Sequence, residues 1–146
     1  MALFMTAASV GLAATDVVGA AAVSDGQTLT IAGQSFRLHG IAVPEVGTVC
    51  RRQERPFDCG KVAASQLADL TAGATVRCVP IDHAATGRRL ARCSVDGYDL
   101  AGGMVYTGWA RADRGQTDRF NGTEAEARRA GRGLWAAGIL RPPDWQ

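Results

Sequence analysis

The stretch RLHGIAVPE, from Arg37 to Glu45, carries an arginine at one end and a carboxylate at the other. An arginine guanidinium binds phosphate or carboxylate groups through a planar fork of N–H donors, and a glutamate can accept a proton in acid–base chemistry. The centre of the stretch, with Ala42 and Val43, offers no polar side chain. Two interpretations are open: the charged residues belong to a phosphate site, or they form a structural ion pair.

The residues around this stretch read as strands of alternating polarity. In SFRLHGI, Phe36 and Leu38 face one way and Arg37 faces the other, which is typical of a half-buried strand. Two strand-like runs, VVGAAAV and TLTIA, precede it and are separated by an Asp-Gly turn signal. We therefore expect Arg37 on the face opposite the apolar one, close to the start of a loop over residues 42–58.

The four cysteines favour disulfides over a metal or redox motif, because no pair has C-x-x-C spacing. The strand-like runs ATVRCVPI and RRLARCSV flank the polar segment DHAATG. A hairpin that turns within this segment places Cys78 opposite Cys93, where a cross-strand disulfide fits. Cys50 and Cys59 would then close a short loop. Two such bridges indicate an oxidising compartment.

The order of elements predicts the fold class. One helix is expected over Gly60–Ala72, a second begins after Asp99, and a last one covers 124–132. Three strands, a helix and two further strands form the OB-fold pattern. We therefore expect a β-barrel with helices (α+β), that is, an OB-fold with a five-stranded antiparallel barrel and three helices. A small α+β sandwich remains open on pattern alone.

Six ordered motifs resemble those of staphylococcal-nuclease-like (thermonuclease) domains. They are VSDGQTLTI, FRLHGIAVPE, TGRRLARC, DLAGGMVYTGWA, EAEAR and RGLW, and together they span roughly residues 17 to 138. The chain also resembles a secreted, cysteine-containing subgroup, some members of which are labelled succinoglycan biosynthesis proteins. The fold of this family is an OB barrel, in agreement with the order of the elements.

The resemblance implies roles for particular residues. Active members of the family hydrolyse phosphodiesters of DNA and RNA with one calcium ion. The resemblance assigns phosphate binding to Arg37 and Arg88, and a general-base role to Glu45, so that these three are the candidate catalytic residues. It places Gln27 and Ala42 at the two positions where the family has aspartate ligands for calcium.

These two substitutions decide the function that we expect. Calcium takes six to eight oxygen ligands, and its affinity rises with the number of carboxylates. We therefore expect no cofactor, and an exported, catalytically impaired domain that binds phosphate or nucleic acid through Arg37 and Arg88. One alternative is an active calcium-dependent secreted nuclease in which other groups replace the aspartates. Another is an accessory protein in exopolysaccharide (succinoglycan) biosynthesis, although no obvious carboxylate pair suits glycoside cleavage.

The composition and the N-terminus indicate the domain organisation and the location of the protein. The 146 residues, 47% of them hydrophobic and 21% charged, suit one globular domain rather than a disordered chain. The net charge of +2 is too small to indicate a nucleic-acid partner by itself. We expect a signal-peptide-like segment over 1–14, a domain over 15–146 and a periplasmic or extracellular location. No transmembrane segment is expected in the mature chain.

Overall fold

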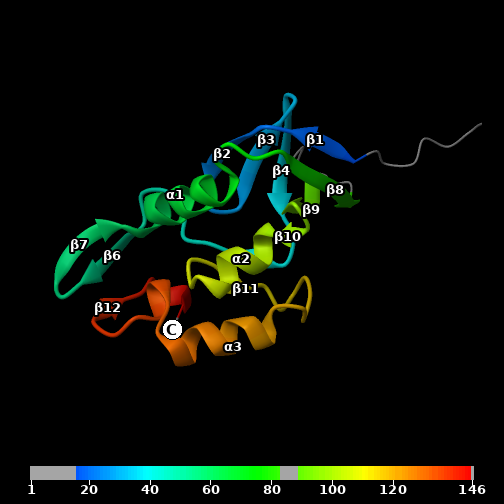
Figure 1. Ribbon diagram of the computed structural model, residues 1–146. Helices are drawn as coiled ribbons and strands as arrows, with labels where there is room; N and C mark the ends of the chain where they lie inside the picture. Colours follow the sequence, from blue (N-terminus) through cyan, green and yellow to red (C-terminus); the bar gives the residue numbers. More distant parts are fainter. Residues whose placement is uncertain (1–15, 83–88, 146) are drawn as a thin grey trace, which may run out of the picture.

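The main layer of the molecule is a sheet of seven strands. The computed structural model describes residues 16–82 and 89–145 (Figure 1). The strands run in the order β1-β8-β9-β4-β3-β2, with β10 paired to β9. Their bounds are β1 Val17–Gly19, β2 Ala21–Asp25, β3 Thr28–Ile31, β4 Gln34–Leu38, β8 Val76–Asp82, β9 Arg89–Val95 and β10 Tyr98–Asp99.

The two ends of this path are halves of one stretch of chain. Strands β1 and β2 are separated only by Ala20; β1 pairs with β8, and β2 pairs with β3. The path therefore leaves from and returns to the same stretch, through β3, β4, β9 and β8. This is the strand order of the OB-fold, and the predicted fold class is confirmed.

One strand pair differs from the expected antiparallel arrangement. Strands β4 and β9 run parallel, with Arg37 opposite Leu90, whereas the other pairs of the sheet are antiparallel. When β1 and β2 are counted as one stretch, the path closes on itself with an odd number of strands. Strand directions cannot alternate around such a path, so one pair must be parallel, and that pair is β4 and β9.

Three α-helices accompany the sheet, as predicted; α1 is shifted by one residue at each end, and both ends of α3 differ from the prediction. Helix α1 covers Cys59–Thr71, and α2 covers Leu100–Tyr106 with Asp99 as the expected N-cap. Helix α3 covers Asn121–Ala130 instead of 124–132 and has no side-chain cap. It begins a turn earlier because the buried side chain of Phe120 fixes its start by packing rather than by capping.

Both predicted disulfides are confirmed. Cys78 lies directly opposite Cys93 in the β8–β9 hairpin, and their Cα atoms are 4.1 Å apart. Cys50 is bonded to Cys59, with a Cα separation of 5.6 Å. Two cross-links therefore secure two different hairpins of the molecule.

The segment expected as a loop over 42–58 contains regular structure. Strands β6 (Val49–Arg52) and β7 (Arg55–Asp58) form a hairpin, and β12 (Ile139–Leu140) pairs with β6. In Figure 1 this hairpin projects beyond α1, at the left of the view. A two-stranded sheet joins β5 (Ile41–Ala42) to β11 (Arg111–Ala112). Two 3-10 turns, η1 (Gly133–Trp135) and η2 (Pro143–Trp145), follow α3 along the chain.

Two apolar clusters hold these elements together. The larger lies between the sheet and the helices α1 and α2, with Phe36, Leu67 and Met104 among its fully buried members. The smaller joins the Cys50–Cys59 disulfide to α3 and the C-terminal residues, where the rings of Trp135 and Trp145 lie 5.2 Å apart. The C-terminal segment is thus part of the folded body.

The signal-peptide-like segment over 1–14 and Arg88 both lie outside the described residues. Within residues 16–82 and 89–145, no helix has the length and apolar character needed to cross a membrane.

Candidate functional site

A pocket of about 390 Å³ brings four of the predicted positions together. Gln27, Arg37, Ala42 and Glu45 all line it, and the remaining lining residues are Ser24, Asp25, Val43 and Val46. They come from the end of β2 and the β2–β3 turn, from β4, and from β5 and the segment that follows it. The pairing of Thr28 with Arg37 in the β3–β4 ladder places the arginine beside that turn.

Gln27 is a structural side chain in this arrangement. It is only 3% exposed, and its Oε1 accepts a hydrogen bond of 3.1 Å from the backbone N–H of Val43. The backbone N–H of Gln27 donates to Oδ1 of Asp25 at 2.8 Å. Because Oε1 must face the Val43 donor, Nε2 points elsewhere, and it is buried with no partner among the described residues. Gln27 thus links the β2–β3 turn to the backbone after β5.

Arg37 is the available cation of the pocket. Phe36 and Leu38 are buried on the opposite face of β4, and Arg37 is exposed, as the alternation predicts. Its guanidinium makes no ion pair with any described residue. The structural ion pair with Glu45 that the sequence left open is therefore not formed. The guanidinium can bind an anion without first breaking an ion pair to residues 16–82 or 89–145.

Glu45 is held at the pocket by the start of α1. Its carbonyl accepts from Thr48 N at 3.0 Å, and Gly60 packs so closely against it that a Cβ at Gly60 would overlap this carbonyl. Asp58 caps α1 by accepting from Lys61 N at 2.9 Å, and its two oxygens also accept from Gly47 N at 3.0 and 2.9 Å. The backbone that presents the exposed Glu45 side chain is consequently fixed.

Sequence reasoning missed both Asp58 and Gly60. An aspartate three residues before Lys61 is a recognisable helix N-cap signal. Its second contact, to Gly47, joins segments that the sequence does not place together. A glycine at the first turn of a helix carries no signal for the close approach of another backbone.

The β4–β5 turn, which separates Arg37 from Ala42, is fixed from the other side. Gly40 adopts a φ of 90°, and a Cβ there would lie 2.7 Å from Cγ2 of Thr117 and 2.9 Å from a ring carbon of Phe120. Gly40 N donates to Oε1 of Gln116 at 2.7 Å. The turn therefore requires glycine for both its conformation and its packing.

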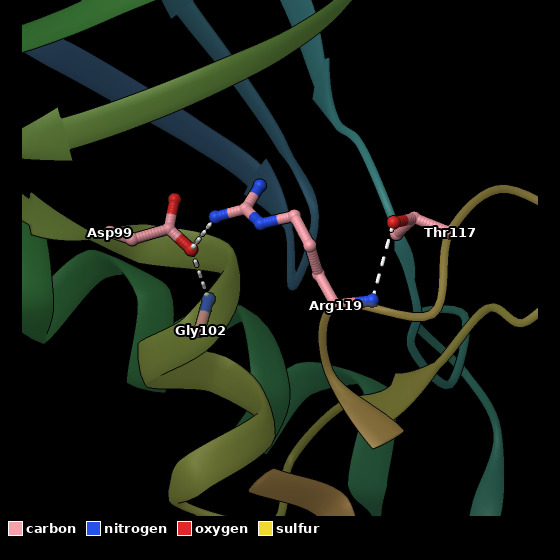
Figure 2. A network of polar contacts seen from close by, with 4 residues as sticks. All are labelled: Asp99, Gly102, Thr117 and Arg119. Atoms are coloured by element: carbon pink, nitrogen blue, oxygen red, sulfur yellow. Dashed lines mark hydrogen bonds and ion pairs between the residues drawn. The ribbon is translucent and has the colours of Figure 1, made fainter. Parts of the chain in front are cut away.

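The loop that covers Gly40 is itself tied to α2. Figure 2 shows Arg119 reaching Asp99, with 3.3 Å between Nη2 and Oδ2, while the same carboxylate oxygen accepts from Gly102 N at 2.9 Å. The backbone N–H of Arg119 donates to Thr117 Oγ1 at 3.3 Å. The helix cap thus supports the loop, and the loop supports the β4–β5 turn.

The oxygen atoms of the pocket match calcium poorly. The Gln27 Oε1 is engaged with Val43, one oxygen of Asp25 accepts from Gln27, and Ala42 offers no side-chain oxygen. In the part of the chain that the structure describes, no three His, Cys, Asp or Glu side chains are placed to hold a metal together. Calcium needs six to eight oxygens, which these residues as they stand do not supply.

Comparisons with known proteins agree with the geometry. The family described as staphylococcal nuclease homologue matches residues 35–137, a range that includes Arg37, Ala42 and Glu45. The chain is 34% identical over 131 residues to the succinoglycan biosynthesis protein ExoI of Rhizobium meliloti (strain 1021), across 86% of this chain and 68% of that protein. With an OB-fold strand order and a pocket at the family's motif, the chain belongs to the staphylococcal nuclease family.

Proposed function

We propose that this chain is an exported domain of the staphylococcal nuclease family that binds a phosphate-bearing ligand, including nucleic acid, and is impaired as a nuclease. The observation that carries the proposal is the hydrogen bond from Val43 N to Oε1 of Gln27. It engages an oxygen at a position where the resemblance places a calcium ligand, while Arg37 in the same pocket makes no ion pair with a described residue.

The chemistry follows from what each residue can still do. Arg37 can bind a phosphate through two parallel hydrogen bonds, and we assign Arg88 the same task. In such hydrolysis the metal ion stabilises developing charge and orients the attacking water. Without it, Arg37 stabilises the bound phosphate and its transition state to a similar degree, which yields binding and little acceleration. Glu45 retains the position of a general base with little catalytic gain.

Export is supported by the covalent structure. Disulfides persist in the periplasm and outside the cell and are rare in the cytosol. This chain forms two, Cys50–Cys59 and Cys78–Cys93. The apolar run over 2–14 has the length of a secretory signal segment.

The test combines calorimetry with a DNA-cleavage assay. We expect inorganic phosphate to bind and Arg37→Gln to weaken this binding at least about tenfold, as for the loss of one charge-assisted pair. We expect DNA hydrolysis at least about a thousandfold below that of a family member with both aspartates. Rapid calcium-dependent cleavage by the purified protein, abolished by Glu45→Gln, would overturn the proposal in favour of an active nuclease.

Restoring the carboxylates sharpens this test. The double variant Gln27→Asp/Ala42→Asp should recover calcium binding and raise cleavage above either single variant. The structure adds a better matched pair, Gln27→Glu/Ala42→Asp, because glutamate keeps the length needed to accept from Val43 N. If calorimetry detects no calcium binding to either double variant, the alignment of Gln27 and Ala42 with the ion ligands is wrong.

A second candidate is a role in exopolysaccharide production. It is supported by the printed name of the relative from Rhizobium meliloti, which is 34% identical to this chain. The test is complementation of a strain that lacks that relative, followed by measurement of its succinoglycan. If the parent chain restores succinoglycan and the Arg37→Gln variant does not, this role depends on the pocket that Arg37 lines. No restoration by the parent chain would remove the second candidate.

A further inference from the structure

The tip of the β6–β7 hairpin carries positive charges that no carboxylate of the described residues pairs with. Arg51, Arg52 and Arg55 lie there, and none of them makes an ion pair with a described residue. The register places Arg52 directly opposite Arg55. Like charges in this relation destabilise a hairpin. A local cost of this kind favours the binding of an anion from outside the molecule.

The hairpin is preformed for such a task. Its two-residue turn uses Gln53 and Glu54 in the left-handed region, with φ of 48° and 68°, where residues other than glycine are uncommon. The turn is anchored by a 3.0 Å hydrogen bond from Gln53 N to the carbonyl of Gly138. The Cys50–Cys59 disulfide closes the base. A rigid display reduces the ordering cost of binding.

One face of the hairpin combines cations with an aromatic ring. Because side chains alternate along a strand, Arg52, Arg55 and Phe57 lie on the same face. The Arg52 guanidinium carbon lies 5.3 Å from the centroid of the Phe57 ring. These residues border a groove of about 650 Å³, whose lining residues are Arg52, Gln53, Arg55, Pro56, Phe57 and Val62. Cations beside a ring are the composition of surfaces that bind single-stranded nucleic acid.

We propose that this groove is a second binding site for single-stranded nucleic acid, in which Arg52 and Arg55 hold backbone phosphates and Phe57 stacks on a base. The inference rests on the proposed function, because the same strand would place another phosphate at Arg37. The two sites are continuous along the chain: Val46 lines the Arg37 pocket, and β6 begins at Val49. With the hairpin included, the protein would contact several nucleotides of the strand instead of one phosphate.

The experiment measures fluorescence anisotropy of a labelled oligothymidylate of about a dozen nucleotides, within the range of site sizes on similar surfaces. The test variant is Arg52→Gln/Arg55→Gln. The matched control is Arg92→Gln/Arg129→Gln, which removes one exposed arginine from β9 and one from α3. Neither arginine makes an ion pair with a described residue. Titrations at several salt concentrations separate phosphate contacts from stacking.

The expected results differ between the variants. Each lost contact to a single strand makes the slope of log K against log salt shallower by about 0.7. Arg52→Gln/Arg55→Gln should therefore change the slope by about 1.4 and weaken binding about 25-fold near 0.1 M salt. The control variant should change the affinity and the salt slope little. Phe57→Leu, which keeps apolar volume without a ring, should weaken binding about fivefold or more with the slope unchanged.

Two outcomes overturn the inference. If the hairpin variant binds the oligonucleotide like the control variant, the groove is not a nucleic-acid site. Phosphate calorimetry on Arg37→Gln then still decides the proposed function separately. If the parent chain fails to bind the oligonucleotide but binds polygalacturonate, and loses that binding with Arg52→Gln/Arg55→Gln, the hairpin recognises an acidic polysaccharide and the assignment to nucleic acid is wrong.

Discussion

The pocket around Gln27 and the tip of the β6–β7 hairpin differ in whether their polar side chains have partners within the protein. In the pocket, Gln27 is buried and its oxygen is engaged with the backbone of Val43. At the tip, Arg52 and Arg55 face each other across the hairpin without a counter-ion among the described residues. In the first region, the side chain of Gln27 serves as an internal link between the β2–β3 turn and the backbone at Val43. The second region carries charges that no ion pair with a described residue neutralises.

This contrast identifies the groups of the molecule that are available to bind a ligand. Hydrogen-bonding groups that are engaged inside the protein stabilise it but are not available to a ligand. Charged groups without a counter-ion in the protein are available to a ligand, and they contribute to the free energy of binding when a complex forms. Arg37 resembles the hairpin arginines in this respect, although it lies in the Gln27 pocket. The following predictions run from the largest expected change in the free energy of unfolding to the smallest.

Gly60→Ala should have the largest effect, because the added Cβ overlaps the Glu45 carbonyl. Relief requires a backbone shift, and we expect a loss of more than about 4 kcal/mol or failure to fold. The matched control is Gly122→Ala in α3, where a Cβ meets no atom within 4 Å. This control should be neutral or stabilising by up to about 1 kcal/mol. Urea unfolding measures both, and equal effects would contradict the close packing of α1 on the Glu45 turn.

Removal of either disulfide should cost about 2–4 kcal/mol, since the two closed loops are similar in length. Their consequences for binding should differ. Cys50→Ala/Cys59→Ala loosens the base of the hairpin and should also weaken oligothymidylate binding. Cys78→Ala/Cys93→Ala serves as the control, because its site lies within the β8–β9 ladder. Urea unfolding and anisotropy measure the two properties. Equal losses of affinity would show that the hairpin base has no particular part in binding.

Gln27→Met should lower the free energy of unfolding by about 1–3 kcal/mol, because it leaves the part-buried Val43 N–H without its acceptor. The control is Gln66→Met in α1, where no hydrogen bond of the side chain is lost and a change within about 0.5 kcal/mol is expected. Thermal unfolding of the two variants provides the comparison. A Gln27 variant as stable as the parent would mean that this link contributes nothing.

Arg55→Glu should give the smallest effect and the opposite sign. A glutamate opposite Arg52 replaces repulsion with attraction, and we expect a gain of about 0.2–1 kcal/mol. Arg92→Glu is the control, because Arg92 lies opposite the uncharged Val79. Urea unfolding at low salt measures the gain. A loss of stability at Arg55 would show that the paired arginines do not repel each other in the fold.

The sequence predicted the parts of the fold that depend on local pattern. Alternating apolar residues and turn residues placed Cys78 opposite Cys93, and the aspartate before an apolar run located the cap of α2 at Asp99. Where tertiary packing sets a boundary, pattern failed, as at the start of α3. The β6–β7 hairpin was missed because Gln53 and Glu54 are not residues that usually form a two-residue turn.

The residue types alone specify which side-chain groups line the pocket: an arginine at 37, an amide at 27, no side-chain oxygen at 42 and a carboxylate at 45. How those groups are used depends on the three-dimensional fold. The Gln27 amide bonds to a backbone N–H sixteen residues away, and Asp58 and Gly60 fix the Glu45 turn. Backbone donors and carbonyls are the same at every position. Which of them a side chain meets is therefore set by the path of the chain and not by residue type.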